Sequence, residues 1–262
     1  MGSGKGTALI TGATKGIGYE LAKCFARHGY HLVLVARDHT QLAHVAEELT
    51  RAHGISASII AKDLGHPTAA ADIMEVLTRE QLEVDALVNN AGFGTYGPFA
   101  SAELATQEDM LRVNLVALTQ LTHHLLEGML ARRRGKILNV ASTAAFQPGP
   151  LMAVYYATKA YVLSFSEALA NEVRGSGVTV TVLCPGPTPT AFHERAGIQR
   201  RRLRLRELSA AVVAQSGYDG LMRGASVVIP GWSNRLLTVV VRLFPRNVVT
   251  AIVRRINEGR GE

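Results

Sequence analysis

Tyr155 and Lys159 lie four residues apart near the start of a predicted helix, so their side chains project from one face of it. A tyrosine with its ordinary pKa of about 10 is a poor acid–base group at neutral pH. A nearby ammonium group favours the phenolate and moves the pKa of the tyrosine toward the working range. Tyr156 and Tyr161 have no cation at this offset, so the spacing selects Tyr155 as the candidate acid–base residue.

Ser142 lies thirteen residues before Tyr155 and follows the apolar run Ile137–Val140. If that run is a parallel strand, the hydroxyl stands at its carboxyl end, where open α/β sheets bind ligands. Taken alone, a Tyr-xxx-Lys pair is typical of a surface helix, and a serine after a strand commonly caps or turns the chain. Together, and downstream of a nucleotide-binding turn, the three residues indicate a catalytic site.

That turn follows the first apolar run, Thr7–Thr11, as Gly12-Ala13-Thr14-Lys15-Gly16-Ile17-Gly18, and a helical pattern begins directly after it. Gly12 allows a tight turn, while Gly16 and Gly18 let the backbone approach a pyrophosphate and let helix and strand pack closely. The helix N-terminus then offers free N–H groups to an anion. The spacing is Gly-xxx-Gly-x-Gly and differs from the commoner Gly-x-Gly-xx-Gly.

The end of the second apolar run bears on the choice of cofactor, because a dinucleotide fold contacts the adenosine ribose there. Arg37 stands nineteen residues after Gly18, and Lys15 lies inside the glycine turn. Two cations can pair with a 2′-phosphate, which favours NADP(H) over NAD(H). The alternatives are that Arg37 is a solvated charge and Asp38 a helix cap, or that Asp38 turns toward the ribose and favours NAD.

Short apolar runs alternate with longer helical patterns along most of the chain. The predicted strands are Thr7–Thr11, His31–Ala36, Ser56–Ala61, Ala86–Asn89, Gly135–Val140, Val178–Leu183 and Ser226–Ile229. The predicted helices include Gly18–Gly29, Gln41–His53, Thr106–Arg132 and Tyr155–Arg174, and Asp38 with Gln41 forms a capping pair. The alternation predicts an α/β fold with a doubly wound parallel seven-stranded sheet of the Rossmann type, three layers deep. We expect one catalytic domain over residues 1–262, with a substrate lid at about 187–224 and an apolar, basic C-terminal segment at about 231–262.

With these motifs in order, the sequence resembles the short-chain dehydrogenase/reductase family from Thr7 to about Thr190. Besides the glycine turn and Ser142, Tyr155 and Lys159, the matching residues are Asp63-Leu64, Asn89-Asn90-Ala91-Gly92, Asn114 and Pro185-Gly186-Pro187-Thr188-Pro189-Thr190. The stretch Phe93–Phe99 is similar to the branch of DltE-like reductases and 17β-hydroxysteroid dehydrogenase-like proteins.

The resemblance implies a site and a mechanism. Ser142 and Tyr155 would hold the substrate carbonyl oxygen, Tyr155 would donate the proton, Lys159 would lower its pKa and bind the nicotinamide ribose, and Asn114 would hold a water linking Lys159 to solvent. The implied cofactor contacts are Gly12, Thr14, Lys15, Gly16, Ile17, Gly18, Arg37, Asp63, Leu64, Asn90, Ala91, Gly92, Tyr155, Lys159, Pro185, Gly186, Thr188 and Thr190. Asn90 as a structural amide, Asp63 as a helix start and Asn114 as a helix cap or kink stay open as alternatives.

The predicted activity is NADPH-dependent reduction of a hydrophobic ketone, such as a 3-oxoacyl group or a steroid, to the secondary alcohol. The alternative is an NADP-binding sensor or scaffold without turnover, which we would expect to have lost Tyr155 or Lys159. The partner is a small-molecule carbonyl or alcohol, no metal is expected, and the family implies a homodimer or homotetramer. The two cysteines, Cys24 and Cys184, fit no disulfide framework or zinc spacing and are interpreted as buried thiols in a reducing cytoplasm.

Composition sets further limits on partners. The chain has 262 residues, 28 Lys and Arg against 21 Asp and Glu, and a net charge of +7, which suits an acidic partner without choosing one. The sequence shows no basic strand interleaved with aromatic residues and no recognition helix, so it does not indicate binding to nucleic acid. The basic run Arg200–Arg206 falls in the expected lid. It can bind an anionic group of the substrate or an anionic membrane, or it can be a solvated helix face. We favour the solvated helix face.

The C-terminal segment combines apolar residues with arginines and permits three interpretations. It can close the substrate pocket, form a subunit contact or lie in a membrane interface, and we favour core or oligomer packing over peripheral membrane contact. The single tryptophan, Trp232, is expected to pack in the interior.

Overall fold

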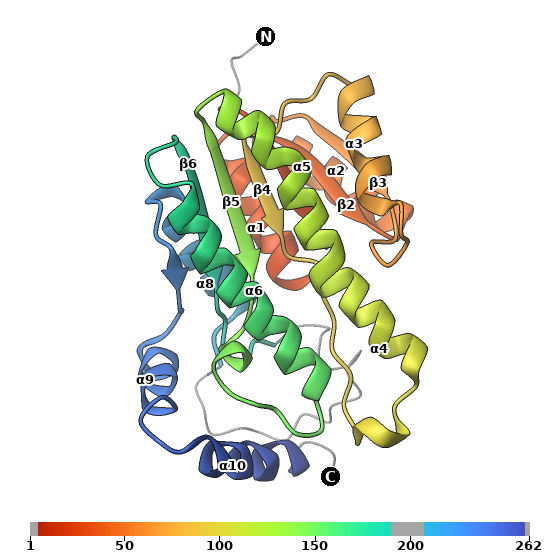
Figure 1. The fold of residues 1–262 in the computed structure, drawn as a ribbon. Coiled ribbons are helices and arrows are strands. Elements are labelled where there is room, and N and C mark those ends of the chain that lie inside the picture. The colour runs from red at the N-terminus through yellow and green to blue at the C-terminus, as the bar shows by residue number, and fades with distance from the viewer. Residues whose placement is uncertain (1–4, 190–206, 260–262) are drawn as a thin grey trace.

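Parallel strands form one seven-stranded sheet in the computed structural model, which describes residues 5–189 and 207–259 (Figure 1). The order is β3-β2-β1-β4-β5-β6-β7, and every neighbouring pair is parallel. The strands are β1 (Thr7–Thr11), β2 (His31–Ala36), β3 (Ala57–Ala61), β4 (Ala86–Asn89), β5 (Gly135–Val140), β6 (Val178–Leu183) and β7 (Val227–Val228). The order reverses at β1, which is flanked by β2 and β4, so the sequence-based prediction of a doubly wound Rossmann-type sheet is confirmed.

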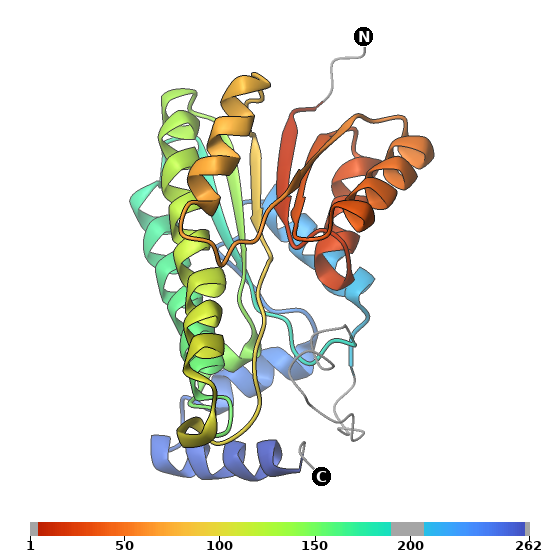
Figure 2. The same cartoon turned by 90° about the vertical axis from the view of Figure 1, so that its right-hand side faces the viewer.

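Helices cover both faces of the sheet (Figure 2). The helices are α1 (Gly16–Arg27), α2 (His39–His53), α3 (Ala69–Arg79), α4 (Leu104–Leu111), α5 (Leu118–Ala131), α6 (Ala153–Glu172), α8 (Ala210–Met222), α9 (Trp232–Val240) and α10 (Arg246–Glu258). One core joins α1, α2 and α8 to the sheet, and a second joins α3, α5 and α6 to its other face. The strands are apolar on both sides because both sides are buried.

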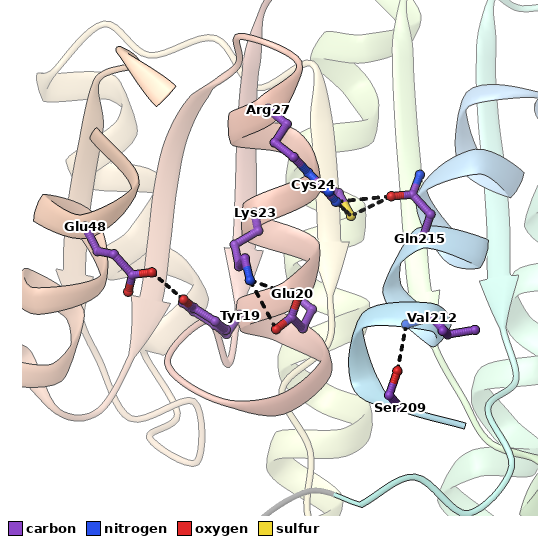
Figure 3. Close-up of polar contacts among 9 residues, drawn as sticks. All are labelled: Tyr19, Glu20, Lys23, Cys24, Arg27, Glu48, Ser209, Val212 and Gln215. Carbon is purple, nitrogen blue, oxygen red and sulfur yellow. Dashed lines mark hydrogen bonds and ion pairs between the residues drawn. The ribbon is translucent and has the colours of Figure 1, made fainter. Parts of the chain in front are cut away.

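The first core is closed by a polar seam between α1 and its neighbours (Figure 3). Arg27 Nη2 donates to Gln215 Oε1 of α8 at 3.1 Å and lies 3.2 Å from the Cys24 sulfur. On the other side, Tyr19 donates its hydroxyl proton to Glu48 of α2 at 2.5 Å. These contacts hold the helix that carries the glycine turn at its N-terminus. Cys24 and Cys184 are both free and buried, as expected.

The long helix predicted at Thr106–Arg132 differs from the structure. It is built as α4, then a π-helical segment Arg112–Ala117, then α5. The extra residue per turn in a π-helix cannot be read from apolar periodicity, and such segments are frequent at functional sites. Asn114 lies inside this segment.

At the carboxyl end of the sheet, the chain finishes in α9 and α10, and α10 runs across the bottom of Figures 1 and 2. The expectation that Trp232 packs in the interior is wrong: it is 77% exposed, since it begins α9 on the outside of the molecule. Over residues 5–189 and 207–259, no helix is long and apolar enough to cross a membrane.

Candidate active site

A cavity of about 540 Å³ opens at the carboxyl ends of the central strands. It brings together most residues that the sequence singled out: Gly12, Thr14, Lys15, Gly16, Ile17, Arg37, Asp63, Leu64, Asn90, Ala91, Gly92, Ser142, Tyr155, Lys159, Pro185, Gly186 and Thr188. Gly18 and Asn114 lie behind this wall and do not line the cavity. Thr190 and the basic run Arg200–Arg206 lie outside the described residues.

The glycine turn is shaped for close approach at the N-terminus of α1. Gly12 and Gly16 have φ values of +66° and +60°, in the left-handed region that favours glycine. A Cβ at Gly12 would stand 2.9 Å from Asn90 Nδ2 and 3.0 Å from the Ala91 backbone. No side chain caps α1, so the N–H groups of its first turn are open to an anion. The turn thus fits the pyrophosphate of a dinucleotide.

Asn90 ties the end of β4 to this turn. Its Nδ2 donates to the carbonyl oxygens of Thr11 at 2.9 Å and Gly12 at 3.2 Å. A Cβ at Gly18 would overlap the Gly12 oxygen and Asn90 Nδ2, so only glycine fits there. Asn90 and Gly18 therefore shape the turn from behind, which agrees with the interpretation of Asn90 as a structural amide.

The end of β2 forms the far end of the cavity. Asp38 accepts a hydrogen bond from Gln41 N at 3.0 Å and caps α2, as the capping pair predicted. Arg37 and Lys15 are exposed on the same cavity and form no ion pair with any acid in the described part of the chain. The sequence did not single out Lys62, which also lines the cavity and pairs with Asp72. Lys62 directly precedes Asp63 in the sequence, and this position could have indicated that it lies at the cofactor end of the cavity.

Ser142 stands just beyond β5 and links that strand to the loop after β6. Its Oγ accepts from Ala144 N at 3.1 Å and lies 3.4 Å from the Pro185 oxygen, to which it can donate. Thr143 N donates to the same oxygen at 2.8 Å. The hydroxyl is thus held at the cavity wall by backbone groups, with a weak donor contact that a ligand oxygen can replace.

Tyr155 and Lys159 lie in the first two turns of α6. Lys159 is buried, and its Nζ donates to the Val140 oxygen at the end of β5 at 2.8 Å. Burial lowers the pKa of Lys159 from its ordinary value to about 8. The ammonium lies 5.9 Å from the centroid of the Tyr155 ring. The α6 geometry therefore places a cation beside the tyrosine that the spacing selected.

Cys184 directly follows β6, and its side chain interacts electrostatically with Lys159. Burial raises the pKa of the Cys184 thiol to about 12, so it stays protonated at neutral pH. A neutral thiol cannot compensate the lysine charge and is a poor nucleophile. The interpretation of Cys184 as an inert buried thiol agrees with this.

Both ends of the Asn114 amide form hydrogen bonds within the protein. Its Oδ1 accepts from Phe93 N at 3.1 Å, and its Nδ2 donates to the Phe93 oxygen at 2.9 Å and to Thr158 Oγ1 at 3.1 Å. A Cβ at Gly92 would stand 3.0 Å from Asn114 Oδ1 and 3.4 Å from Lys159 Nζ. Asn114 therefore joins the loop after β4 to α6, and we treat it as a positioning residue.

The rest of the wall is largely apolar and includes elements that the sequence only offered as alternatives. Met152 precedes α6, and the C-terminal helices contribute Leu237, Val253 and Ile256. Closure of the substrate pocket was one of the three interpretations of the C-terminal segment. Apolar periodicity could not distinguish it from the other two, because it depends on contacts with loops that are remote in sequence. Gln147 also lines the cavity, with its Oε1 buried and without a hydrogen-bond partner among the described residues.

Comparison with known proteins agrees with the motifs. The model of the short chain dehydrogenase family matches residues 6–201. A very-long-chain 3-oxoacyl-CoA reductase of Laccaria bicolor is 34% identical over 90% of this chain and 72% of that protein. The 17-beta-hydroxysteroid dehydrogenase type 3 of Mus musculus is 38% identical over 68% of this chain and 58% of that enzyme.

The solved structure of a short-chain dehydrogenase from Sphingobium yanoikuyae in complex with NADPH superposes with a TM-score of 0.80. It is 33% identical to this protein, and the match covers 87% of this chain and 88% of that one. Family match, fold and cavity agree: this chain belongs to the short-chain dehydrogenase family of NAD(P)-dependent oxidoreductases.

Proposed function

We propose that the protein reduces a hydrophobic ketone to the secondary alcohol with NADPH. The observation that carries the proposal is the joint placement of Ser142, Tyr155 and Lys159 on one cavity with the glycine turn. A protein that only senses the dinucleotide needs the turn but has no use for the three polar side chains. We assign these residues, together with the cofactor contacts that the family resemblance implies, as the site.

The chain's own residues supply binding, orientation and the proton. When bound, the nicotinamide supplies the hydride for the carbonyl carbon. Ser142 and Tyr155 donate hydrogen bonds to the carbonyl oxygen, where negative charge develops. Tyr155 transfers its proton to that oxygen, and the Lys159 ammonium stabilises the phenolate that remains. Asn114 holds α6 against the loop after β4, so that the lysine keeps its place.

The preference for NADPH rests on the end of the cavity beyond β2. Arg37 and Lys15 are exposed there and have no acidic partner in the described part of the chain, so they are available to a 2′-phosphate. Asp38, the group that would accept from a ribose 2′-hydroxyl, already accepts from Gln41 N as a helix cap. Both observations favour the phosphorylated cofactor.

The substrate class follows from the wall that faces the catalytic groups. Met152, Leu237, Val253 and Ile256 offer an apolar surface for a long or bulky substrate. The names of the Laccaria bicolor and Mus musculus relatives point to 3-oxoacyl-CoA and steroid substrates of that character. We therefore propose a hydrophobic 3-oxoacyl group or a steroid-like ketone.

The test measures oxidation of NADPH and NADH against a panel of 3-oxoacyl thioesters and ketosteroids. We expect turnover with NADPH, and a loss of at least about hundredfold in kcat for Tyr155→Phe, because the proton donor is removed. Tyr161→Phe, from the outer face of the same helix, is the matched control and keeps activity. NADPH binding without turnover of any compound, by wild type and both variants alike, would contradict the proposal and favour a sensor.

The assembly and location of the protein are part of this proposal. Leu111, Val116 and Tyr161 are exposed on α4, the π-helical segment and α6, and we propose that these helices form a homodimer or homotetramer. Light scattering of Val116→Glu tests this, since a buried carboxylate would dissociate the oligomer. We further propose that residues 1–262 act as one catalytic domain in the cytoplasm. The lid expected at 187–224 does not extend over α8, because α8 packs in the core against the sheet through Val213 and Leu221. Residues 190–206 of that expected lid lie outside the described residues.

A further inference from the structure

The segment from α9 to α10 exposes an unusual share of the apolar surface. Nine of the sixteen large apolar side chains that the described residues expose lie between Trp232 and Ile256. Two of them, Leu237 and Ile256, also line the cavity, and the other seven are Trp232, Leu236, Val239, Leu243, Phe244, Val248 and Ile252. Exposed apolar side chains that gather on two neighbouring helices indicate an interaction site, whereas scattered apolar residues need no explanation. We call this surface the α9–α10 face.

Helix α9 is inverted relative to a helix that packs on a core. Its buried positions are polar, Asn234 and Thr238, while Trp232, Leu236 and Val239 point outward. The buried polar groups are satisfied locally, because Asn234 Nδ2 donates to Pro230 O and Thr238 Oγ1 to Arg235 O. A surface helix in water turns its apolar face inward. The orientation of α9 therefore suits an apolar environment outside the protein.

Helix α10 shows the same feature with a firm anchor. Val249 and Val253 are buried in a cluster with Met152 and Tyr156, and this packing holds the helix in place. The neighbouring stripe of Val248 and Ile252 has the same four-residue spacing and stays exposed, and Ile256, one turn further on, lines the cavity. Figure 1 shows α9 and α10 together at one end of the molecule. The apolar stripe is therefore presented on a fixed helix.

The charge of this face selects its partner. Residues 231–259 contain five arginines and one acidic residue, Glu258, which pairs with Arg254. Arg246 and Arg255 are exposed and have no ion pair in the described structure. A second copy packed on this face would bring arginines against arginines, which disfavours a dimer there. An anionic lipid surface satisfies both the apolar side chains and the arginines.

We propose that the α9–α10 face docks the protein onto an anionic membrane surface. The apolar side chains enter the boundary between headgroups and acyl chains, and the arginines contact the lipid phosphates. The residue pattern by itself favoured packing for this segment, because apolar periodicity does not show which side of a helix the core takes. This inference concerns binding to lipid and stands apart from the proposed reaction.

Trp232 provides the readout, because it is the single tryptophan of the chain and lies on the face itself. The experiment titrates the protein with vesicles of phosphatidylcholine, and with equimolar phosphatidylcholine and phosphatidylglycerol. We expect a blue shift of tryptophan emission with the anionic vesicles and quenching by lipids brominated on the acyl chain. Neutral vesicles should give a partition coefficient lower by about tenfold or more.

Two variants and a control separate the apolar and the charged contributions. Leu243→Asp, at a position 76% exposed, should abolish the blue shift, and Arg246→Gln with Arg255→Gln should lower the partition coefficient for anionic vesicles by about tenfold. Leu104→Asp, at a position 66% exposed on α4, should bind vesicles as the wild type does. All variants should keep the NADPH affinity of the wild type, which shows that they are folded.

Two results would overturn the proposal. One is an emission spectrum that anionic vesicles leave unchanged. The other is an oligomer that Leu243→Asp dissociates while vesicle binding is absent, which would make the face an interface between copies of the chain. Loss of turnover with vesicle binding intact would concern the proposed reaction and leave the docking standing.

Discussion

Lys159 Nζ donates a hydrogen bond to the backbone oxygen of Val140 at 2.8 Å, which fastens helix α6 to the end of β5. Ser142 follows Val140 by two residues, so one contact sets the position of both the lysine and the serine relative to Tyr155. The acceptor is a neutral carbonyl, and the lysine forms no ion pair among the described residues. Burial therefore governs its charge and lowers its pKa to about 8.

Replacing this lysine should separate activity from stability. Lys159→Met should lower kcat by at least about hundredfold, because the phenolate of Tyr155 loses its cation. The folded protein should lose little stability at pH 7, because the removed charge was disfavoured by burial and only its hydrogen bond to Val140 opposes the gain. Steady-state kinetics and urea unfolding at pH 7 measure the two effects.

The pH dependence of the same pair of proteins provides the control. The pKa of Lys159 is about 8 in the fold and 10.5 when unperturbed, so the unfolded chain binds more protons between these values. The wild type should therefore gain free energy of unfolding relative to Lys159→Met as pH rises from about 8 to 10.5, and show no such gain below it. Parallel curves for the two proteins across this window would contradict the assignment.

Arg37 should discriminate between the two cofactors. Arg37→Glu removes a cation at the end of β2 and adds a carboxylate, which repels a 2′-phosphate and accepts from a 2′-hydroxyl. We expect kcat/KM for NADPH to fall by about tenfold or more, and kcat/KM for NADH to rise. Arg51→Glu, which makes the same change of charge on the exposed side of α2, is the matched control. An equal loss in both variants would attribute the effect to net charge alone.

Asp38 should act on stability and not on cofactor choice. Asp38→Ala removes the acceptor for Gln41 N and should lower the free energy of unfolding by about 1 kcal/mol. Asp38→Asn keeps the cap and should restore most of that loss. Unfolding in urea measures the loss of stability, and the ratio of kcat/KM for NADPH to kcat/KM for NADH measures the cofactor preference. A shift of that ratio toward NADPH in both variants would place the carboxylate on the ribose instead.

Gly18 tests how tightly the glycine turn is built. Gly18→Ala places a methyl group into the space of the Gly12 oxygen and Asn90 Nδ2, so the turn must shift. We expect the free energy of unfolding to fall by about 2 kcal/mol and NADPH to bind more weakly. Urea unfolding measures the first effect, and fluorescence titration with NADPH measures the second.

The matched control for that substitution is Gly128→Ala in α5. Its new methyl group would meet only the end of the flexible Arg132 side chain, at 3.0 Å. Alanine is a better helix former than glycine, so the variant should gain about 0.5–1 kcal/mol and bind NADPH unchanged. Equal effects of the two substitutions would show that the close contacts behind Gly18 are not decisive.

Local sequence patterns were sufficient for the sheet and the reactive residues. Continuous apolar strands between helical patterns indicated a parallel sheet buried on both faces, because a strand that is buried on both faces is apolar at every position. The four-residue spacing of Tyr155 and Lys159 and the glycine turn before α1 are short-range features, so the sequence alone could single out these residues.

Contacts between remote segments were decided only by the tertiary structure. The charge state of Lys159 and the π-helical segment at Asn114 depend on burial and on partners that no spacing reveals. The same holds for α9, where a mixed apolar and polar pattern allowed either face to turn inward. The fold buries Asn234 and leaves Trp232 outside, because hydrogen bonds to nearby backbone oxygens satisfy the polar side while the apolar side finds no core to cover it.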